Sequence, residues 1–293
     1  MNEQQKKEIK EALKQRSTLK GGYSKVAAEL SISVATISNV MNDKWEGIAN
    51  TMWRKLADKL NILKEGWQLA ETRNFKILQE LMAESQQHSE SYALCIPAGC
   101  GKTETSLWYR QNHANVALVQ CEEYFTKRDF LVRLSRGLGL DVTDLPNNQL
   151  LERIEAQALS LERPLIILDE FDKVSDQIVL FFVTLYNRLN GKCGLIMLST
   201  IYMETRVKRG LRLHKKGYEE FYSRVGCKFI TSGNLLSQDI VAICKANGIT
   251  DSADIERVVH DCQGDGRRVK RKINAMIRSR KSEEKKMQEV ENE

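Results

Sequence analysis

The sequence Ile-Pro-Ala-Gly-Cys-Gly-Lys-Thr at residues 96–103 constrains this chain more than any other stretch. An apolar run at residues 92–96 leads into it, and a helix-compatible segment at residues 104–110 follows it. Strand, glycine loop, Lys-Thr and helix is the layout of a phosphate-binding loop, because glycines let successive backbone N–H groups turn toward one anion. The start of the following helix favours the same anion. We therefore predict a nucleotide site at Pro97, Ala98, Gly99, Cys100, Gly101, Lys102, Thr103 and Glu104.

One position departs from the usual pattern G-x-x-x-x-G-K-[ST], since Ile96 stands where that pattern has glycine. We interpret Ile96 as the last residue of the strand, replacing a glycine that is not among the closest phosphate contacts. The competing interpretation is a chance glycine turn before a helix. The flanking strand and helix favour nucleotide binding.

A second motif lies roughly 65 residues after Lys102, where the apolar strand at residues 164–168 ends in Asp169-Glu170. Adjacent carboxylates at a strand end suit Mg²⁺-dependent hydrolysis of a nucleoside triphosphate. Asp169 is predicted to lie by the metal opposite Thr103, and Glu170 to polarise the attacking water. Such pairs also occur as helix caps, but together with the glycine loop they indicate a triphosphatase site.

From Tyr92 onward, strand and helix patterns alternate, which predicts an α/β fold with a parallel sheet covered by helices. We assign this nucleotide-binding core to residues 91–235. A linker and a helix are predicted at residues 63–90, and a helical lid with a charged C-terminal tail at residues 236–293. The tail after Arg280 is rich in charge, and we expect it to be frayed or disordered.

Residues 1–62 read as a separate all-α unit containing a helix, a tight turn and a second helix. Six apolar residues fall at positions that would bury together: Val26, Ala27, Leu30, Ile32, Ile37 and Val40. Short polar side chains remain for the outer face of the second helix, and we predict that four of them contact DNA: Ser33, Thr36, Ser38 and Asn39. The alternative is an ordinary helical domain that binds another protein.

Charge and cysteine content bear on partners and compartment. The net charge is +6, and 20 of the 45 Lys and Arg residues lie from Ile201 to the C-terminus, which suits a polyanionic partner. The seven cysteines form no C-x-x-C pair, so we expect reduced thiols and neither a disulfide framework nor a zinc site. No signal peptide or membrane-length apolar run is apparent, and we expect an intracellular protein without membrane association.

With these motifs in place, the chain resembles an AAA+ ATPase and, more narrowly, the phage Mu B family of transposition activators. The resemblance covers about residues 20–280. It rests on the glycine loop through Glu104, on Leu168-Asp169-Glu170, on the strand at residues 194–198 and on the segment at residues 221–224. It implies a P-loop ATPase core with a parallel sheet and a small helical lid, preceded by a helix-turn-helix domain.

The resemblance also implies further roles. Lys102 and Glu170 would act in catalysis, Thr200 is similar to the first sensor of the family, and Arg224 looks like an arginine finger that reaches a neighbouring subunit's ATP. Arg267 looks like the second sensor, facing the nucleotide. For each arginine the alternative is a surface or DNA-facing charge. The implied cofactors are ATP and Mg²⁺, and the implied location is the cytoplasm of a bacterial or phage-infected host cell.

The function implied is a DNA-stimulated ATPase that forms ATP-dependent oligomers or filaments on double-stranded DNA with little sequence preference, through nucleotide-bridged subunit interfaces. Such an assembly would recruit or activate a DDE-type transposase. Lys127 and Arg128 are the best candidates for DNA contacts in the core, followed by residues 206–216. The alternatives are a helicase-loader-like accessory ATPase of the DnaC/IstB type and an ATP-switched helix-turn-helix transcription regulator.

Overall fold

The computed structural model describes residues 3–60, 67–142 and 145–291. Its strands are β1 (Ser91–Cys95), β2 (Val116–Gln120), β3 (Leu165–Asp169), β4 (Gly194–Ser199) and β5 (Ile230–Thr231). Its helices are α1 (Glu3–Lys20), α2 (Tyr23–Leu30), α3 (Val34–Met41), α4 (Asn50–Lys59), α5 (Arg73–His88), α6 (Lys102–Asn112), α7 (Lys127–Gly137), α8 (Asn147–Ser160), α9 (Asp176–Leu189), α10 (Ile201–Arg212), α11 (Tyr218–Arg224), α12 (Ser237–Ala246), α13 (Ser252–Cys262) and α14 (Gly266–Glu291), with a 3-10 turn η1 (Phe171–Lys173).

The strands form one parallel sheet in the order β2-β3-β4-β1-β5. Strand β4 lies between β1 and β3, so the carboxyl ends of these three strands meet at one edge. Strands β3 and β4 are buried along their whole length, as their continuous apolar runs predict for a sheet covered on both faces. The predicted α/β fold class is confirmed.

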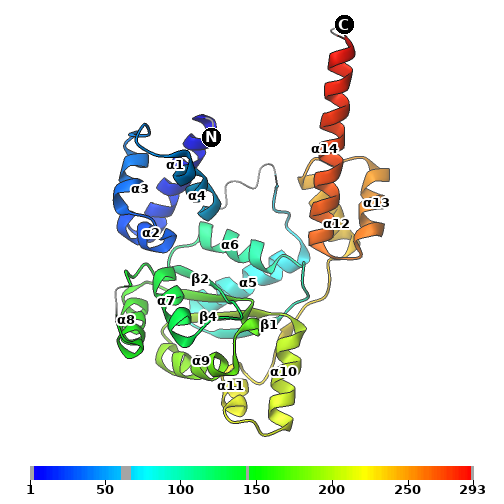
Figure 1. The fold of residues 1–293 in the computed structure, drawn as a ribbon. Helices are drawn as coiled ribbons and strands as arrows, with labels where there is room; N and C mark the ends of the chain where they lie inside the picture. The colour runs from blue at the N-terminus through cyan, green and yellow to red at the C-terminus, as the bar shows by residue number, and fades with distance from the viewer. Residues whose placement is uncertain (1–2, 61–66, 143–144, 292–293) are drawn as a thin grey trace.

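Alternate residues of the strands face two different cores. Leu165 and Ile167 pack with residues of α5 and α6 on one face, while Ile166 and Leu168 pack with residues of α7, α8, α9 and α11 on the other. Figure 1 shows this arrangement, with α5 and α6 on one side of the sheet and α9, α10 and α11 on the other. The two helical layers fix the strand ends from which the candidate site is built.

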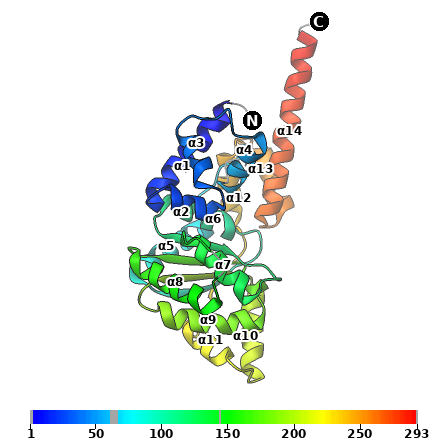
Figure 2. The same cartoon turned by 60° about the vertical axis from the view of Figure 1, so that its left-hand side comes forward.

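Helices α1–α4 enclose an apolar core of their own, separate from the two cores of the sheet. All six residues predicted to bury together in this unit belong to it. Residues 31–33 connect α2 to α3, and Ser31 adopts a left-handed backbone conformation with φ 50°. Figure 2 shows this unit lying over α6 and α7. The assignment of α2 and α3 as a DNA-reading motif stays a prediction.

Helices α12–α14 form the third unit, which packs around a small apolar core that also receives Trp67 and Ala70 from the segment before α5. Helix α14 projects away from this unit in Figure 1. The expected frayed or disordered tail after Arg280 is wrong, because α14 continues to Glu291. Lys, Glu, Gln and Met have high helix propensity, and this favours a helix where charge content alone suggested disorder. The domain boundaries given above stay predictions.

Glycine 194 sets how closely α5 approaches the sheet. A Cβ atom at this position would collide with the carbonyl group of Ser85, whose carbon would lie 2.7 Å away. We predict that Gly194→Ala lowers the free energy of unfolding by about 1–3 kcal/mol, because backbone must move to make room. Denaturant unfolding measures this, and Gly47→Ala is the control, since a Cβ there meets nothing within 4 Å. Equal stability of the two variants would contradict the prediction.

Candidate nucleotide and metal site

The glycine loop runs from the end of β1 into α6. Gly99 and Gly101 both have positive φ, 76° and 88°, so a residue with a side chain would be strained at either position. The amide of Ile96 donates to the carbonyl of Ser199 at 3.0 Å, which extends the pairing of β1 with β4 by one residue beyond the strand itself. Ile96 is 1% exposed, so its side chain faces the core and not the loop.

Lys102 is the first residue of α6, and its ammonium group lies against the loop's own backbone. Its Nζ donates to the carbonyl oxygens of Ile96 at 2.7 Å and Pro97 at 3.0 Å. Burial lowers the pKa of this lysine, although the charge of Asp169 acts in the opposite direction. The ammonium group is therefore held at the loop by oxygen atoms that phosphate oxygens can replace.

Thr103 and Asp169 supply two ligands that suit Mg²⁺. The Thr103 hydroxyl donates to Oδ2 of Asp169 at 2.6 Å, which joins the start of α6 to the end of β3. Asp169 is 1% exposed, and burial raises the pKa of its carboxyl group. A hydroxyl and a carboxylate in contact match the oxygen ligands that Mg²⁺ takes beside phosphate oxygens, so these residues fit the metal.

Glu170 directly follows β3 in a left-handed conformation with φ 55°. Its Oε2 accepts from Nζ of Lys173 at 2.8 Å and from Nε2 of Gln120 at 3.3 Å. Burial favours a higher pKa, but the hydrogen bonds from Lys173 and Gln120 outweigh it, and the pKa of Glu170 is lowered. Here the carboxylate is held by two side chains that sequence reasoning did not select.

Thr200 follows β4 and lines the same cavity as the loop. Its hydroxyl donates to Oδ2 of Asp172 at 2.6 Å. Asp172 also lines the cavity, and sequence reasoning missed it. The signal was present, since Asp172 stands two residues after Glu170 in the 3-10 turn that continues from β3.

The lid is joined to the loop by a backbone hydrogen bond. The amide of Gly266, at the start of α14, donates to the carbonyl of Gly99 at 2.9 Å. A Cβ on Gly266 would lie 2.5 Å from that same carbonyl oxygen. Arg267 follows directly and lines the cavity, and its role as a second sensor facing the nucleotide stays a prediction. Two glycines therefore permit the lid to sit against the phosphate loop.

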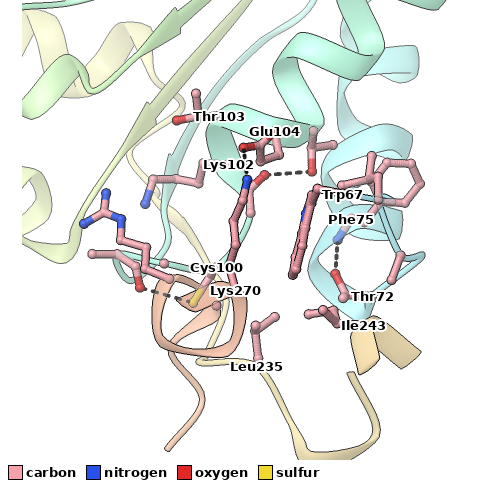
Figure 3. Close-up of a pocket in the computed structure, with 18 of the residues that line it drawn as sticks. Trp67, Thr72, Phe75, Cys100, Lys102, Thr103, Glu104, Leu235, Ile243 and Lys270 are labelled. Atoms are coloured by element: carbon pink, nitrogen blue, oxygen red, sulfur yellow. Dashed lines mark hydrogen bonds and ion pairs between the residues drawn. The ribbon is translucent and has the colours of Figure 1, made fainter. Parts of the chain in front are cut away.

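Beyond the loop, the cavity of about 390 Å³ opens into an aromatic and aliphatic compartment. Trp67, Phe75, Leu235 and Ile243 line it, and Figure 3 shows Lys270 of α14 facing Trp67. The Lys270 ammonium group lies 5.0 Å from the centre of the Trp67 ring and 3.9 Å from a carboxylate oxygen of Glu104. An apolar compartment beside a phosphate loop suits the base of a nucleotide.

Two side chains of the lid bind the segment that carries Trp67. Asn247 accepts from the amide of Gln68 at 2.8 Å and donates to the carbonyl of Gln68 at 3.0 Å. Asp239 accepts from the amides of Arg73 at 2.7 Å and Leu236 at 2.9 Å. The base compartment is thus assembled by segments about 170 residues apart in the chain, which is why periodicity did not reveal it.

The remaining predicted residues lie outside the cavity. Arg224 ends α11, and its Nε donates to Oδ1 of Asn187 at 2.9 Å. It does not line the cavity of its own chain. A finger that acts on a neighbouring subunit's nucleotide requires such a position, and this role stays a prediction.

The predicted DNA contacts lie on two helices. Lys127 and Arg128 begin α7 and are exposed, and Arg128 Nη1 donates to the carbonyl of Leu145 at 2.6 Å. Ser33 caps α3 by accepting from the amide of Thr36 at 3.1 Å, and the two hydroxyls also bond each other. The Ser38 hydroxyl accepts from Nδ2 of Asn42 at 3.2 Å, and Asn39 is exposed. Most of these side chains hold local structure, so their DNA contacts also stay predictions.

Comparison with known proteins agrees with this geometry. The AAA domain family model matches residues 83–206, from α5 into α10. Cdc6p of Pyrobaculum aerophilum, known from its crystal structure, has a similar fold with a TM-score of 0.54 and 15% sequence identity, over 76% of this chain and 65% of that chain. The chain therefore has the fold of the AAA+ ATPases, which confirms the fold class inferred from its motifs.

Within that class, the chain is similar to the ATP-dependent target DNA activator B of Escherichia phage Mu. The two are 23% identical over 255 residues, which cover 83% of this chain and 78% of that protein. The activator B of Escherichia phage D108 matches to the same extent. The resemblance to the phage Mu B family is confirmed. Within the described residues, no helix is long and apolar enough to cross a membrane.

The contact between Gly99 and Gly266 leads to a prediction about nucleotide affinity. Gly266→Ala should weaken ATP binding by about tenfold or more, because the added methyl group pushes the lid away from the loop. Titration with a fluorescent ATP analogue measures this. Gly233→Ala is the control, because a Cβ there meets only Arg73 Nη2 at an ordinary 3.5 Å. Unchanged affinity in Gly266→Ala would show that the lid does not contribute to the site.

Proposed function

We propose that the chain is a DNA-stimulated, Mg²⁺-dependent ATPase that assembles on target duplex DNA in its ATP state and recruits or activates a transposase. The observation that carries the proposal is that Lys102, Thr103 and Glu170 line one cavity that also has a base compartment, while Asp169 accepts directly from the Thr103 hydroxyl. The similarity to proteins named as ATP-dependent target DNA activators supports the choice of DNA and transposition.

In the proposed reaction, the base of ATP lies against Trp67 and Phe75, and its phosphates lie in the glycine loop. Lys102 exchanges the carbonyls of Ile96 and Pro97 for phosphate oxygens. Thr103 and Asp169 would hold Mg²⁺, which would supply positive charge beside the phosphates.

Glu170 orients the water that attacks the γ-phosphate, and the products are ADP and phosphate. Its carboxylate must leave Lys173 and Gln120, or turn while they hold it, to reach that water. Thr200 and Asp172 form a polar pair beside this position, which suits a sensor of the γ-phosphate.

Arg224 completes the site from a neighbouring subunit in this proposal, so hydrolysis depends on assembly. Two neighbouring copies then share each ATP, and duplex DNA that aligns many copies raises the rate. Disassembly follows hydrolysis, because ADP lacks the γ-phosphate that Arg224 contacts. Nucleotide state thereby controls how long the protein remains on DNA.

Assembly on DNA tests the proposal most directly. With a non-hydrolysable ATP analogue and duplex DNA, the wild-type protein should form large complexes in analytical ultracentrifugation and ordered oligomers in electron micrographs. Lys102→Ala should form none, because this variant lacks the ammonium group that would bind the phosphates. Full assembly by Lys102→Ala would refute the proposal. A single footprint at one palindromic site would favour a transcription regulator instead.

Shared sites predict a specific result in mixtures of two inactive variants. Glu170→Gln and Arg224→Ala should each hydrolyse ATP at least about 100-fold more slowly than wild type. In an equal mixture, random pairing places a normal Glu170 beside a normal Arg224 at about a quarter of the sites, since the subunit contact is head-to-tail. Recovery of about a quarter of the wild-type rate is expected. A mixture as inactive as its components would contradict a role of Arg224 in a neighbouring site.

A further inference from the structure

Helices α1–α4 meet the ATPase core through a buried group of charged side chains, which we call the seam cluster. It consists of Arg16 and Lys20 of α1, Glu29 of α2 and Arg110 of α6. The side chains of Arg16, Lys20 and Glu29 are between 4% and 7% exposed, and that of Arg110 is 16% exposed. Three cations therefore surround one carboxylate at the junction of two structural units.

Glu29 is the centre of the cluster. Its oxygens accept from Nε of Arg16 at 3.1 Å and also from Nη2 of the same guanidinium group. Arg110 Nη1 lies 3.4 Å away and Lys20 Nζ lies 4.0 Å away. Burial alone would raise the pKa of Glu29, but the surrounding cations lower it, so this carboxylate is charged.

Backbone carbonyls of the core stabilise the excess positive charge, and two of these carbonyls lie at the C-terminal ends of helices. Lys20 donates to the carbonyl of Val116 at 2.9 Å and to that of Gly137, the last residue of α7, at 3.2 Å. Arg16 donates to the carbonyl of Arg110 in the last turn of α6. Cations are stabilised at helix C-termini, where carbonyls lack partners and the helix dipole is negative. Charged groups buried in this way fix orientation more than they add stability.

Four cations lie at the edge of the same junction, namely Lys55 and Lys59 of α4 and Arg133 and Arg136 of α7. The end of α4 is tied to α6, because Gln111 Nε2 donates to the carbonyl of Leu60 at 3.0 Å, and the end of α7 is tied to Lys20. Lys59 and Arg136 each directly precede one of these anchored residues. Lys55 and Arg133 lie one turn back on the same helices.

The charges of the other three side chains act on Lys59 across the junction. Besides burial, the charges of Lys55, Arg133 and Arg136 lower the pKa of Lys59, while Asp58 acts in the opposite direction. Lys55 and Arg133 are exposed, and Lys59 and Arg136 are half-buried. Gathering like charges costs free energy that a polyanion can offset, and duplex DNA presents regularly spaced phosphates.

We propose that Lys55, Lys59, Arg133 and Arg136 form one phosphate-binding surface for duplex DNA, built jointly by α4 and α7 and present only while the seam cluster holds the two units together. This inference rests on the proposed function for its partner. It differs from the contacts predicted above at α3 and at the start of α7, since neither unit alone carries the whole surface.

The first experiment removes the surface charges. Replacing Lys55, Lys59, Arg133 and Arg136 together by Gln should lower duplex affinity and reduce the slope of log affinity against log salt by about 3–4, since each phosphate contact contributes about 0.9. The control variant replaces Lys76, Arg153, Lys228 and Arg257 by Gln, which are exposed and change the net charge equally. Equal loss in the two variants, or an unchanged slope, overturns the inference.

The second experiment breaks the seam without touching the surface. Glu29→Gln makes the protein more positive, so simple attraction would tighten duplex binding. The joint surface requires the opposite, and we expect about tenfold weaker binding because three unbalanced cations separate the units. Glu11→Gln, an exposed residue of α1, is the charge-matched control and should bind no more weakly than wild type. Binding by Glu29→Gln as tight as that control overturns the inference.

A cross-link provides the rescue. Gly139 has φ 79°, so a cysteine there carries some backbone strain, but its Cβ would lie 3.2 Å from Cβ of Lys25, close to the separation that a disulfide spans. Lys25→Cys and Gly139→Cys, combined with Cys227→Ser to remove the exposed thiol, are introduced into Glu29→Gln. Oxidation should restore duplex affinity, and reduction should remove it again. Affinity independent of oxidation, in a sample whose cross-link is verified by mass, overturns the inference.

These results also separate this inference from the proposed function. Wild-type protein that binds no duplex at any nucleotide state refutes both. Wild-type protein that assembles with ATP on duplex, while the four-residue variant matches its control, refutes the joint surface alone. Circular dichroism of each variant verifies that lost affinity is not lost folding.

Discussion

The backbone contacts of the phosphate loop with strand β4 and with helix α14 determine the geometry of the candidate site. Ile96 is held to β4 by its amide, Lys102 is held to the loop by two carbonyls, and Gly99 accepts from the first amide of α14. Each of these bonds has a backbone atom as donor or acceptor, so together they fix the path of the loop. The sheet brings Asp169 and Thr200 to the same edge as the loop, because β4 lies next to β1 and β3 lies next to β4 in the order that the strands adopt.

Much of this arrangement could be predicted from the sequence because it depends on local patterns. The glycine loop, the apolar strand before Asp169 and the alternation of strands and helices each occupy a short window, and all three reappear in the structure. The burial of Val26, Ile37 and Val40 was likewise predicted from spacing along two short helices. The helical end of α14 was not predicted, because the interpretation of that segment gave more weight to its charge content than to its helix propensity.

The residues that escaped prediction act through contacts between distant segments. Trp67 and Lys270 meet across the base compartment although some 200 residues separate them, and Asn247 joins the segment of Trp67 to the lid. Gln120 and Lys173 reach Glu170 from a neighbouring strand and a following turn. No periodic pattern marks such residues, since each is a single polar or aromatic side chain whose role depends on which distant segment packs against it. Arg16 and Glu29 would read as an ordinary surface pair from sequence, yet they are buried at a junction.

The resting position of Lys102 has a consequence for how the protein discriminates between ligands. Its ammonium group donates to two carbonyl oxygens within the loop, so an anion that binds Lys102 has to replace hydrogen bonds that are already made. An incoming group gains only the difference between its own oxygens and two carbonyls. A single small anion offers little advantage over them, whereas a polyphosphate that also engages the loop amides and a metal between Thr103 and Asp169 offers much more. In the proposed nucleotide site, these two carbonyls would therefore compete with the ligand and favour long phosphate chains over single anions.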